Sequence, residues 1–355
     1  MVDLASVFGT RHPIVQAPMA GVQGSALAIA VGRAGALGSL PAAMLTPDAL
    51  RAELAALRDS GLPHNVNFFA HVAPEPDATR EAAWREELAP YYREYGVDPA
   101  SIPSGPGRVP FSADTADVLA EFAPPVVSFH FGLPGPALLD RVRSWDAVVM
   151  STATTVDEAR WLARHGVDVV IAQGLEAGGH RGHFLAPDLA GQLPTLDLVA
   201  AITVAVDLPV LATGGIADVE GVRAALGAGA AGVQVGSALL CCDEATTSDR
   251  HRAALQSPAV QDTAITNIFT GRPARGIANR AIREVGGLVD GRALSDLAPE
   301  FPLAGNAMAP LRAAAEASGS ADFTPLWVGE GAAPRTGPAA SIIAALAEGL
   351  GGAGR

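Results

Sequence analysis

A histidine in a glycine-rich loop is the side chain of this sequence best suited to chemistry. His180 lies within Gln173-Gly-Leu-Glu-Ala-Gly-Gly-His-Arg-Gly182, directly after an apolar run. A neutral imidazole can accept or donate a proton near pH 7, and glycines let the backbone come close to a ligand. The sequence therefore predicts a catalytic acid or base at His180, with a structural or merely exposed histidine as the alternative.

Two short glycine motifs further along the chain could bind a phosphate. Gly214-Gly215 and Gly236-Ser237 each follow an apolar run. In a barrel of alternating strands and helices, the loops after the last two strands commonly bind phosphate through backbone N–H groups. Lysine is absent and all 24 basic residues are arginines, which excludes a P-loop and a Schiff-base lysine. We expect a phosphate at these glycines and the Ser237 hydroxyl, against the alternative of two ordinary turns.

Other polar residues also follow or end apolar runs. Asn67 and Gln173 are amides that need partners if they are buried, and either a cofactor or neighbouring backbone could supply them. His130 is a candidate substrate-binding residue, with a satisfied buried histidine as an equal alternative. His183 follows His180 by three residues, but no nearby cysteine or set of carboxylates completes a metal site, so we expect no metal.

These residues occupy regular places in a repeating pattern of apolar runs and helix-like stretches. Continuous apolar runs are typical of strands buried on both faces. The expected strands are 14–17, 36–39, 65–69, 126–129, 147–151, 168–172, 210–213 and 232–235. Alternating units of this kind predict an α/β fold, a (β/α)8 TIM barrel, with a doubly wound open sheet as the alternative. The polar residues then gather at the carboxyl ends of the strands, where barrel active sites lie.

Two stretches interrupt this alternation. Residues 70–110, rich in Pro, Glu, Arg and Tyr, form an expected insertion after the third strand, with a helix over 84–96. Residues 241–318 form an expected smaller α/β lid domain on the substrate side, inserted after the eighth strand. We therefore predict a barrel over 1–240 that binds the phosphate of a cofactor, and a C-terminal return to the barrel over 319–355.

One glycine motif is misleading. Gly227-Ala-Gly-Ala-Ala-Gly232 has the spelling of a dinucleotide-binding fingerprint. That fingerprint must follow a strand and open a helix, whereas this run follows an expected helix and opens an expected strand. We interpret it as a helix end and a turn rather than as a nicotinamide dinucleotide site.

Composition limits the remaining possibilities. The 355 residues are 49% hydrophobic and 17% charged, which is typical of a globular protein with a large core. A formal net charge of −13 disfavours nucleic acid and anionic membrane surfaces as partners. The adjacent Cys241 and Cys242 predict reduced thiols, and no signal peptide or membrane span is seen, so we expect a cytoplasmic monomer or homodimer.

An arginine-rich stretch lies in the expected lid domain. Residues 267–280 carry Arg272, Arg275 and Arg280 without a balancing acid. We interpret most of them as part of a solvated face or an interdomain contact. The functional alternative is a weak attractor for anions above the pocket.

Taken together, these motifs resemble class I of the nitronate monooxygenase family, once called 2-nitropropane dioxygenases, over almost the whole chain. The most specific is Ala172-Gln-Gly-Leu-Glu-Ala-Gly-Gly-His-Arg-Gly182. The other motifs that resemble the family are Gln16-Ala-Pro-Met-Ala-Gly21, Asn65-Val-Asn-Phe-Phe69, Val127-Ser-Phe-His-Phe-Gly132, Ala212-Thr-Gly-Gly-Ile-Ala-Asp218, Val233-Gln-Val-Gly-Ser237 and Thr270-Gly-Arg-Pro-Ala-Arg275. One departure is that Phe301 and its neighbours stand where the family often has tyrosine or lysine.

The resemblance implies an FMN-dependent monooxygenase. FMN and O2 would convert an alkyl nitronate, a nitroalkane or propionate 3-nitronate to a carbonyl product and nitrite, with His180 as the base. No metal or nicotinamide is implied. The expected cofactor-binding residues are Ala17, Pro18, Met19, Asn67, Gln173, Gly178, Gly179, Gly214, Gly215, Gln234, Val235, Gly236 and Ser237.

Two other functions fit the same pattern. Related barrels with similar Gly-Gly-His loops include NAD(P)H-dependent flavin reductases of the enoyl-acyl-carrier-protein reductase and quinone reductase types. A non-catalytic protein that binds flavin or phosphate, as a sensor or partner subunit, is the third candidate. The presence of bound FMN and its response to NADH or to nitronates would separate the three.

Overall fold

The computed structural model describes residues 2–103, 105 and 107–352, and its largest element is a barrel. An eight-stranded parallel sheet has the order β1-β9-β8-β6-β5-β4-β3-β2. Backbone hydrogen bonds of Leu37 with Ile14 and Gln16 join its two ends. The strands are β1 (Ile14–Gln16), β2 (Gly38–Pro41), β3 (His64–Phe69), β4 (Val126–His130), β5 (Val148–Ala153), β6 (Val169–Gln173), β8 (Val210–Thr213) and β9 (Gly232–Val235).

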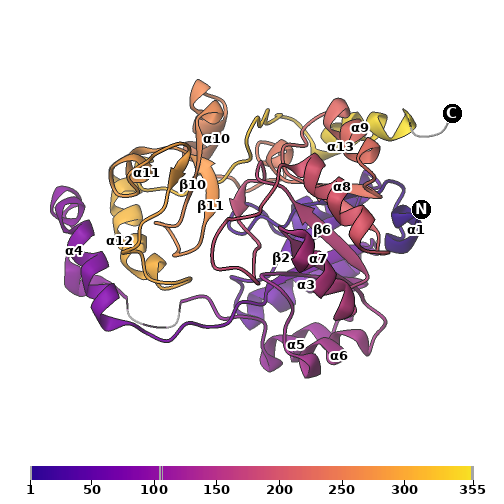
Figure 1. Ribbon diagram of the computed structural model, residues 1–355, viewed down its shortest axis with the longest axis horizontal. Coiled ribbons are helices and arrows are strands. Elements are labelled where there is room, and N and C mark those ends of the chain that lie inside the picture. Colours follow the sequence, from indigo (N-terminus) through magenta and orange to yellow (C-terminus); the bar gives the residue numbers. More distant parts are fainter. Residues whose placement is uncertain (1, 104, 106, 353–355) are drawn as a thin grey trace.

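Helices surround the barrel, as Figure 1 shows on the right. They are α2 (Ser25–Arg33), α3 (Pro47–Ser60), α5 (Ala113–Ala120), α6 (Pro136–Arg143), α7 (Val156–Arg164), α8 (Thr195–Ala205), α9 (Val219–Gly227) and α13 (Ala339–Ala347). Local sequence sets their ends. In α3 the Thr46 side chain caps the first turn, Pro47 begins the helix, and Gly61 ends it in the left-handed conformation. The short α1 (Leu4–Phe8) precedes β1, and η4 (Glu348–Gly352) follows α13.

The predicted (β/α)8 TIM barrel is confirmed. Every expected strand overlaps an observed one, and the largest shift is at β2, which begins at Gly38 rather than at residue 36. The run 227–232 joins the end of α9 to the start of β9. Its glycines therefore form a helix end and a turn, with Gly229 at a φ of 104°, as the order of elements predicts.

A smaller four-stranded sheet covers the carboxyl ends of the barrel strands. Its order is β12-β10-β11-β7. The strands are β10 (Thr263–Thr266), β11 (Ala274–Ile277), β12 (Arg292–Ala293) and β7 (Gly179–His180); with them lie α10 (Asp249–Leu255), α11 (Arg280–Glu284), α12 (Ala304–Ala317) and η3 (Pro258–Gln261). The short η2 (Ser237–Leu239), which follows β9, packs in the barrel core. Because β7 belongs to the loop after β6, this sheet joins the barrel through the segment that carries His180.

The insertion after β3 packs on the smaller sheet's helices rather than on the barrel. It forms α4 (Ala78–Tyr95) and η1 (Pro99–Ser101). The indole of Trp84 donates to the Ala304 carbonyl at 3.3 Å, and the Tyr92 hydroxyl donates to the Ala307 carbonyl at 2.9 Å. Figure 1 shows α4 beside α12, far from the barrel helices. The insertion and the lid therefore share one apolar cluster.

Some expectations fall outside the described residues. Residue 1 of the expected barrel, residues 104 and 106 of the insertion and residues 353–355 of the C-terminal return are among them. Within the described ranges, no helix combines the length and the apolar character needed to cross a membrane.

Candidate active site

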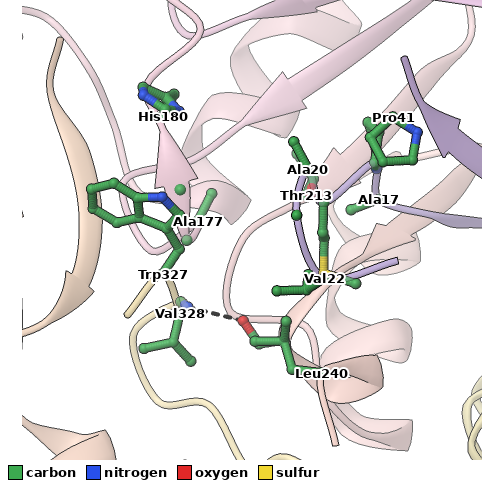
Figure 2. Close-up of a pocket in the computed structure, with 18 of the residues that line it drawn as sticks. Ala17, Ala20, Val22, Pro41, Ala177, His180, Thr213, Leu240, Trp327 and Val328 are labelled. Atoms are coloured by element: carbon green, nitrogen blue, oxygen red, sulfur yellow. Dashed lines mark hydrogen bonds between the residues drawn. The ribbon is translucent and has the colours of Figure 1, made fainter. Parts of the chain in front are cut away.

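A cavity of about 310 Å³ lies between the barrel and the smaller sheet. Figure 2 shows His180 and Trp327 on one side of it and Ala17 and Pro41 on the other. The expected site residues that line it are Ala17, Pro18, Met19, Asn67, His130, Gln173, Gly178, Gly179, His180, Gly214, Gly215, Gln234, Gly236 and Ser237. Val235 instead has its side chain in the barrel core, 1% exposed. The structure thus brings together residues from six of the barrel strands or their loops.

His180 is held between the two parts of the molecule. Its Nε2 lies 2.9 Å from the hydroxyl oxygen of Thr270, which belongs to the turn between β10 and β11. Its carbonyl accepts hydrogen bonds from the Gln173 amide at 2.9 Å and from His130 Nε2 at 3.1 Å. The backbone of His180 is therefore held both by these barrel residues and by the pairing of β7 with β11, and its ring is held by Thr270.

The ring of His180 is neutral at pH 7. Burial, together with the nearby Arg108, His130 and Arg272, lowers the pKa of His180 well below its usual 6.5. Aromatic rings contribute to this dry setting, with the Phe301 ring centroid 5.5 Å and the Trp327 ring centroid 5.6 Å from that of His180. A neutral imidazole can accept a proton, so the environment suits a general base.

His130 and Gln173 line the cavity, but the protein already uses their polar atoms. His130 Nδ1 lies 3.0 Å from the Thr152 hydroxyl, and burial lowers the pKa of His130 to about 3. The carbonyl oxygen of the Gln173 side chain accepts from Gly182 N–H at 2.8 Å. These contacts favour the structural alternatives for both residues, because each one orients the backbone that carries His180.

The glycine motifs after β8 and β9 form an open rim. Gly214 and Gly215 have φ angles of 125° and 67°, which side-chain-bearing residues rarely adopt. Within the described ranges, the N–H groups of Gly215 and Ser237 donate to no protein acceptor. The Ser237 oxygen accepts from Gly329 N–H at 2.9 Å, which leaves its own proton free to donate. This rim offers several donors, as an anion site requires. The Glu176 side chain lies beside Gly215, and its carboxylate accepts hydrogen bonds from the N–H and hydroxyl groups of Thr195.

Two further observations fit a bound flavin nucleotide. The side-chain oxygen of Gln234 is buried and has no hydrogen-bond partner among the residues the structure describes. Gly179, at a φ of 72°, has open space where a Cβ would lie, whereas a Cβ on Gly178 would approach the Gly329 nitrogen to 2.5 Å. The residues present thus leave a planar ligand both room and an unpaired polar atom.

Arg108 at the cavity and Arg272, which acts on His180 from beside the Phe131 ring, were not singled out as site residues from the sequence. Arg108, from the insertion, lines the cavity, and its guanidinium lies 5.9 Å from the Phe301 ring centroid. Arg272 lies 4.1 Å above the Phe131 ring. Arg275 pairs with Glu330, but within the described part of the chain neither Arg108 nor Arg272 forms an ion pair. The unbalanced arginines of 267–280 were the only sequence signal for this cationic wall.

Comparisons with known proteins identify the family of the chain. A family model described as nitronate monooxygenase matches residues 2–349. A nitronate monooxygenase of Pseudomonas aeruginosa is 39% identical over 98% of each chain, and one of Paraburkholderia phytofirmans is 38% identical over 97% of this chain and 93% of its own. The crystal structure of a nitroalkane oxidase from Streptomyces ansochromogenes is 38% identical, covers 98% of each chain and has a TM-score of 0.87. The chain therefore belongs to the nitronate monooxygenase family of enzymes.

Proposed function

We propose that this protein is an FMN-dependent nitronate monooxygenase, which oxidises alkyl nitronates with O2 to a carbonyl compound and nitrite. The observation that carries the proposal is that a neutral imidazole, His180, shares one cavity with a glycine rim of unengaged N–H groups. The names of the relatives support the same reaction. Nitroalkanes and propionate 3-nitronate are further candidate substrates.

The rim would hold the phosphate of FMN. The N–H groups of Gly215 and Ser237 and the Ser237 hydroxyl are its donors, and backbone N–H groups bind phosphate without lysine. Gln234 brings an unpaired amide oxygen to the same cavity. When bound, FMN supplies the electron transfer between the organic substrate and O2.

The cavity wall suits an anionic substrate. Arg108 and Arg272 place positive charge near His180, as their effect on the pKa of His180 indicates. A nitronate is an anion, and a cation in a poorly solvated site attracts it strongly. For a neutral nitroalkane, His180 takes the proton from the carbon beside the nitro group, and the C–H electron pair delocalises into the nitro group. The product of that step is the nitronate itself.

The variant His180→Asn tests the role of the imidazole. It removes the base but keeps a polar side chain, so FMN content should match wild type. Nitroethane turnover should fall by about 100-fold or more, which is typical of the loss of a general base. Oxidation of preformed ethylnitronate, which needs no proton abstraction, should fall much less.

His165→Asn is the matched control, because His165 lies at the exposed end of α7, stacked on Trp161 at 3.7 Å. It should leave both activities unchanged. Nitroethane turnover at the wild-type rate in His180→Asn would show that the base is another group.

A further inference from the structure

The hydrogen bond between Thr270 and His180 joins two residues far apart in sequence. The Thr270 side chain is 7% exposed, and its oxygen lies 2.9 Å from His180 Nε2. The next strand, β11, pairs with β7, with Ala274 opposite His180. Arg181 N–H also donates to the Pro273 carbonyl at 2.8 Å. The turn that carries Thr270 is therefore fixed against the histidine at three places, so this contact is built into the fold.

The other ring nitrogen of His180 is the one left for a ligand. Within the described residues, Nδ1 has no hydrogen-bond partner, but it is not one of the fully buried atoms of this kind. It therefore keeps some exposure, and the ring lines the cavity. A neutral imidazole carries one proton, on one of its two nitrogens. If the Thr270 hydroxyl accepts a hydrogen bond from Nε2–H, Nδ1 has a lone pair; if the hydroxyl donates to Nε2, Nδ1 carries the hydrogen.

Two features of the surroundings favour a lone pair on Nδ1. The Thr270 hydroxyl has its own acceptor, the Arg272 carbonyl at 3.5 Å, and it can donate there while accepting from Nε2–H. Arg108 and Arg272 both place positive charge near the ring. A lone pair beside guanidinium groups is electrostatically favoured over an N–H in the same place.

We propose that Thr270 is a positioning residue for His180: its hydroxyl accepts Nε2–H and so leaves the Nδ1 lone pair facing the substrate. The assignment rests on the proposed role of His180 as a base. In the proton-transfer step, Nδ1 takes the proton from the carbon beside the nitro group, the ring becomes an imidazolium held by Thr270, and no electron leaves the substrate.

Ring-nitrogen NMR tests the assignment without any turnover. Two-bond 1H–15N spectra of purified protein labelled at histidine identify the tautomer, and the signals missing from His180→Asn assign His180. The wild type and Thr270→Ser, which keeps the hydroxyl, should show protonated Nε2 and bare Nδ1. Thr270→Val, which keeps the shape, should show a mixture of tautomers. Protonated Nδ1 in the wild type, or an unchanged spectrum in Thr270→Val, would overturn the assignment.

Turnover supplies the second measurement. Thr270→Val should lower kcat for nitroethane by about 10-fold or more with KM within about 2-fold, because only the proton-transfer step is impaired. Ethylnitronate oxidation should stay within about 3-fold of wild type, and Thr270→Ser should restore nitroethane turnover. Equal losses on both substrates would contradict a positioning role. If the tautomers behave as predicted while His180→Asn oxidises nitroethane normally, the proposed base is wrong but the Thr270 contact stands.

Discussion

At the scale of single residues, the environment of His180 matters more than its identity. The chain holds eight histidines, and several have a lowered pKa because they are buried. Burial, with a contribution from Arg272, lowers the pKa of His183 to about 3, and burial lowers that of His251 to about 4. Neither of these rings, however, packs against Phe131 and Phe301 as the His180 ring does. The glycine-rich loop identified His180 from the sequence. Arg108 could not be identified, because a single arginine in a Pro- and Glu-rich insertion carries no periodic signal.

The charges around His180 predict how activity depends on pH. A base works when it is unprotonated, so activity on nitroethane is lost as pH falls through the pKa of His180. Because that pKa lies well below 6.5, the acid limb of kcat/KM should lie below pH 6.5. Arg108 lowers the pKa, so Arg108→Met should raise it and move the acid limb to higher pH. Rate profiles between pH 4.5 and 7 measure both.

Arg312→Met is the control for this prediction. Arg312 also lines the cavity, but it pairs with Glu316 and does not shift the pKa of His180. The acid limb of kcat/KM for nitroethane in Arg312→Met should coincide with that of the wild type. An acid limb at or above pH 6.5 in the wild type, or an unmoved one in Arg108→Met, would contradict the electrostatic account.

At the scale of elements, the strand ends place the glycine rim. The strand β8 was recognisable because strands buried on both faces are continuous apolar runs, and β9 because it follows an expected helix in the repeating pattern. The turns that follow both strands then fall on the active-site face. By contrast, β7 has only two residues and too little sequence to show a period. Its pairing with β11, and the contact of Thr270 with His180 across 90 residues, depend on how the lid packs and were not predicted.

Gly236→Ala tests the rim as a phosphate site. A Cβ there would meet the nearest protein atom, Ala17 Cβ, at 3.3 Å, and the backbone φ of −118° is open to alanine. This contact is tight, so the variant should fold with a slightly lowered Tm. The added methyl group should keep a phosphate from the backbone and weaken FMN binding by about 10-fold or more, or about 1.4 kcal/mol. Titration of the stripped protein with FMN measures this loss.

Gly227→Ala is the matched control for Gly236→Ala, because it adds the same methyl group away from the cavity. Gly227 ends α9, and nothing lies within 4 Å of an added Cβ. Alanine is the better helix former by up to about 1 kcal/mol, so this variant should keep full FMN affinity and a slightly higher Tm. Equal FMN affinity in both variants would mean that the phosphate binds elsewhere.

At the scale of the whole molecule, the barrel and the lid meet at one cationic cavity in a protein whose net charge is −13. Composition and the repeated β/α pattern were enough to predict the barrel. Composition and pattern could not predict that the insertion packs on the lid. The hydrogen bond from Trp84 to the Ala304 carbonyl joins residues 220 positions apart, and the sequence of α4 predicts a helix without indicating which element it packs against. The resulting arrangement closes the barrel end over His180.

Anaerobic absorbance spectroscopy of the purified protein tests the central claim most directly. The protein should show flavin bands, which change rapidly when ethylnitronate is added and not when NADH is added. FMN should be the flavin in the supernatant after heat denaturation. A colourless protein without flavin, or bands that respond to NADH and not to nitronate, would contradict the account.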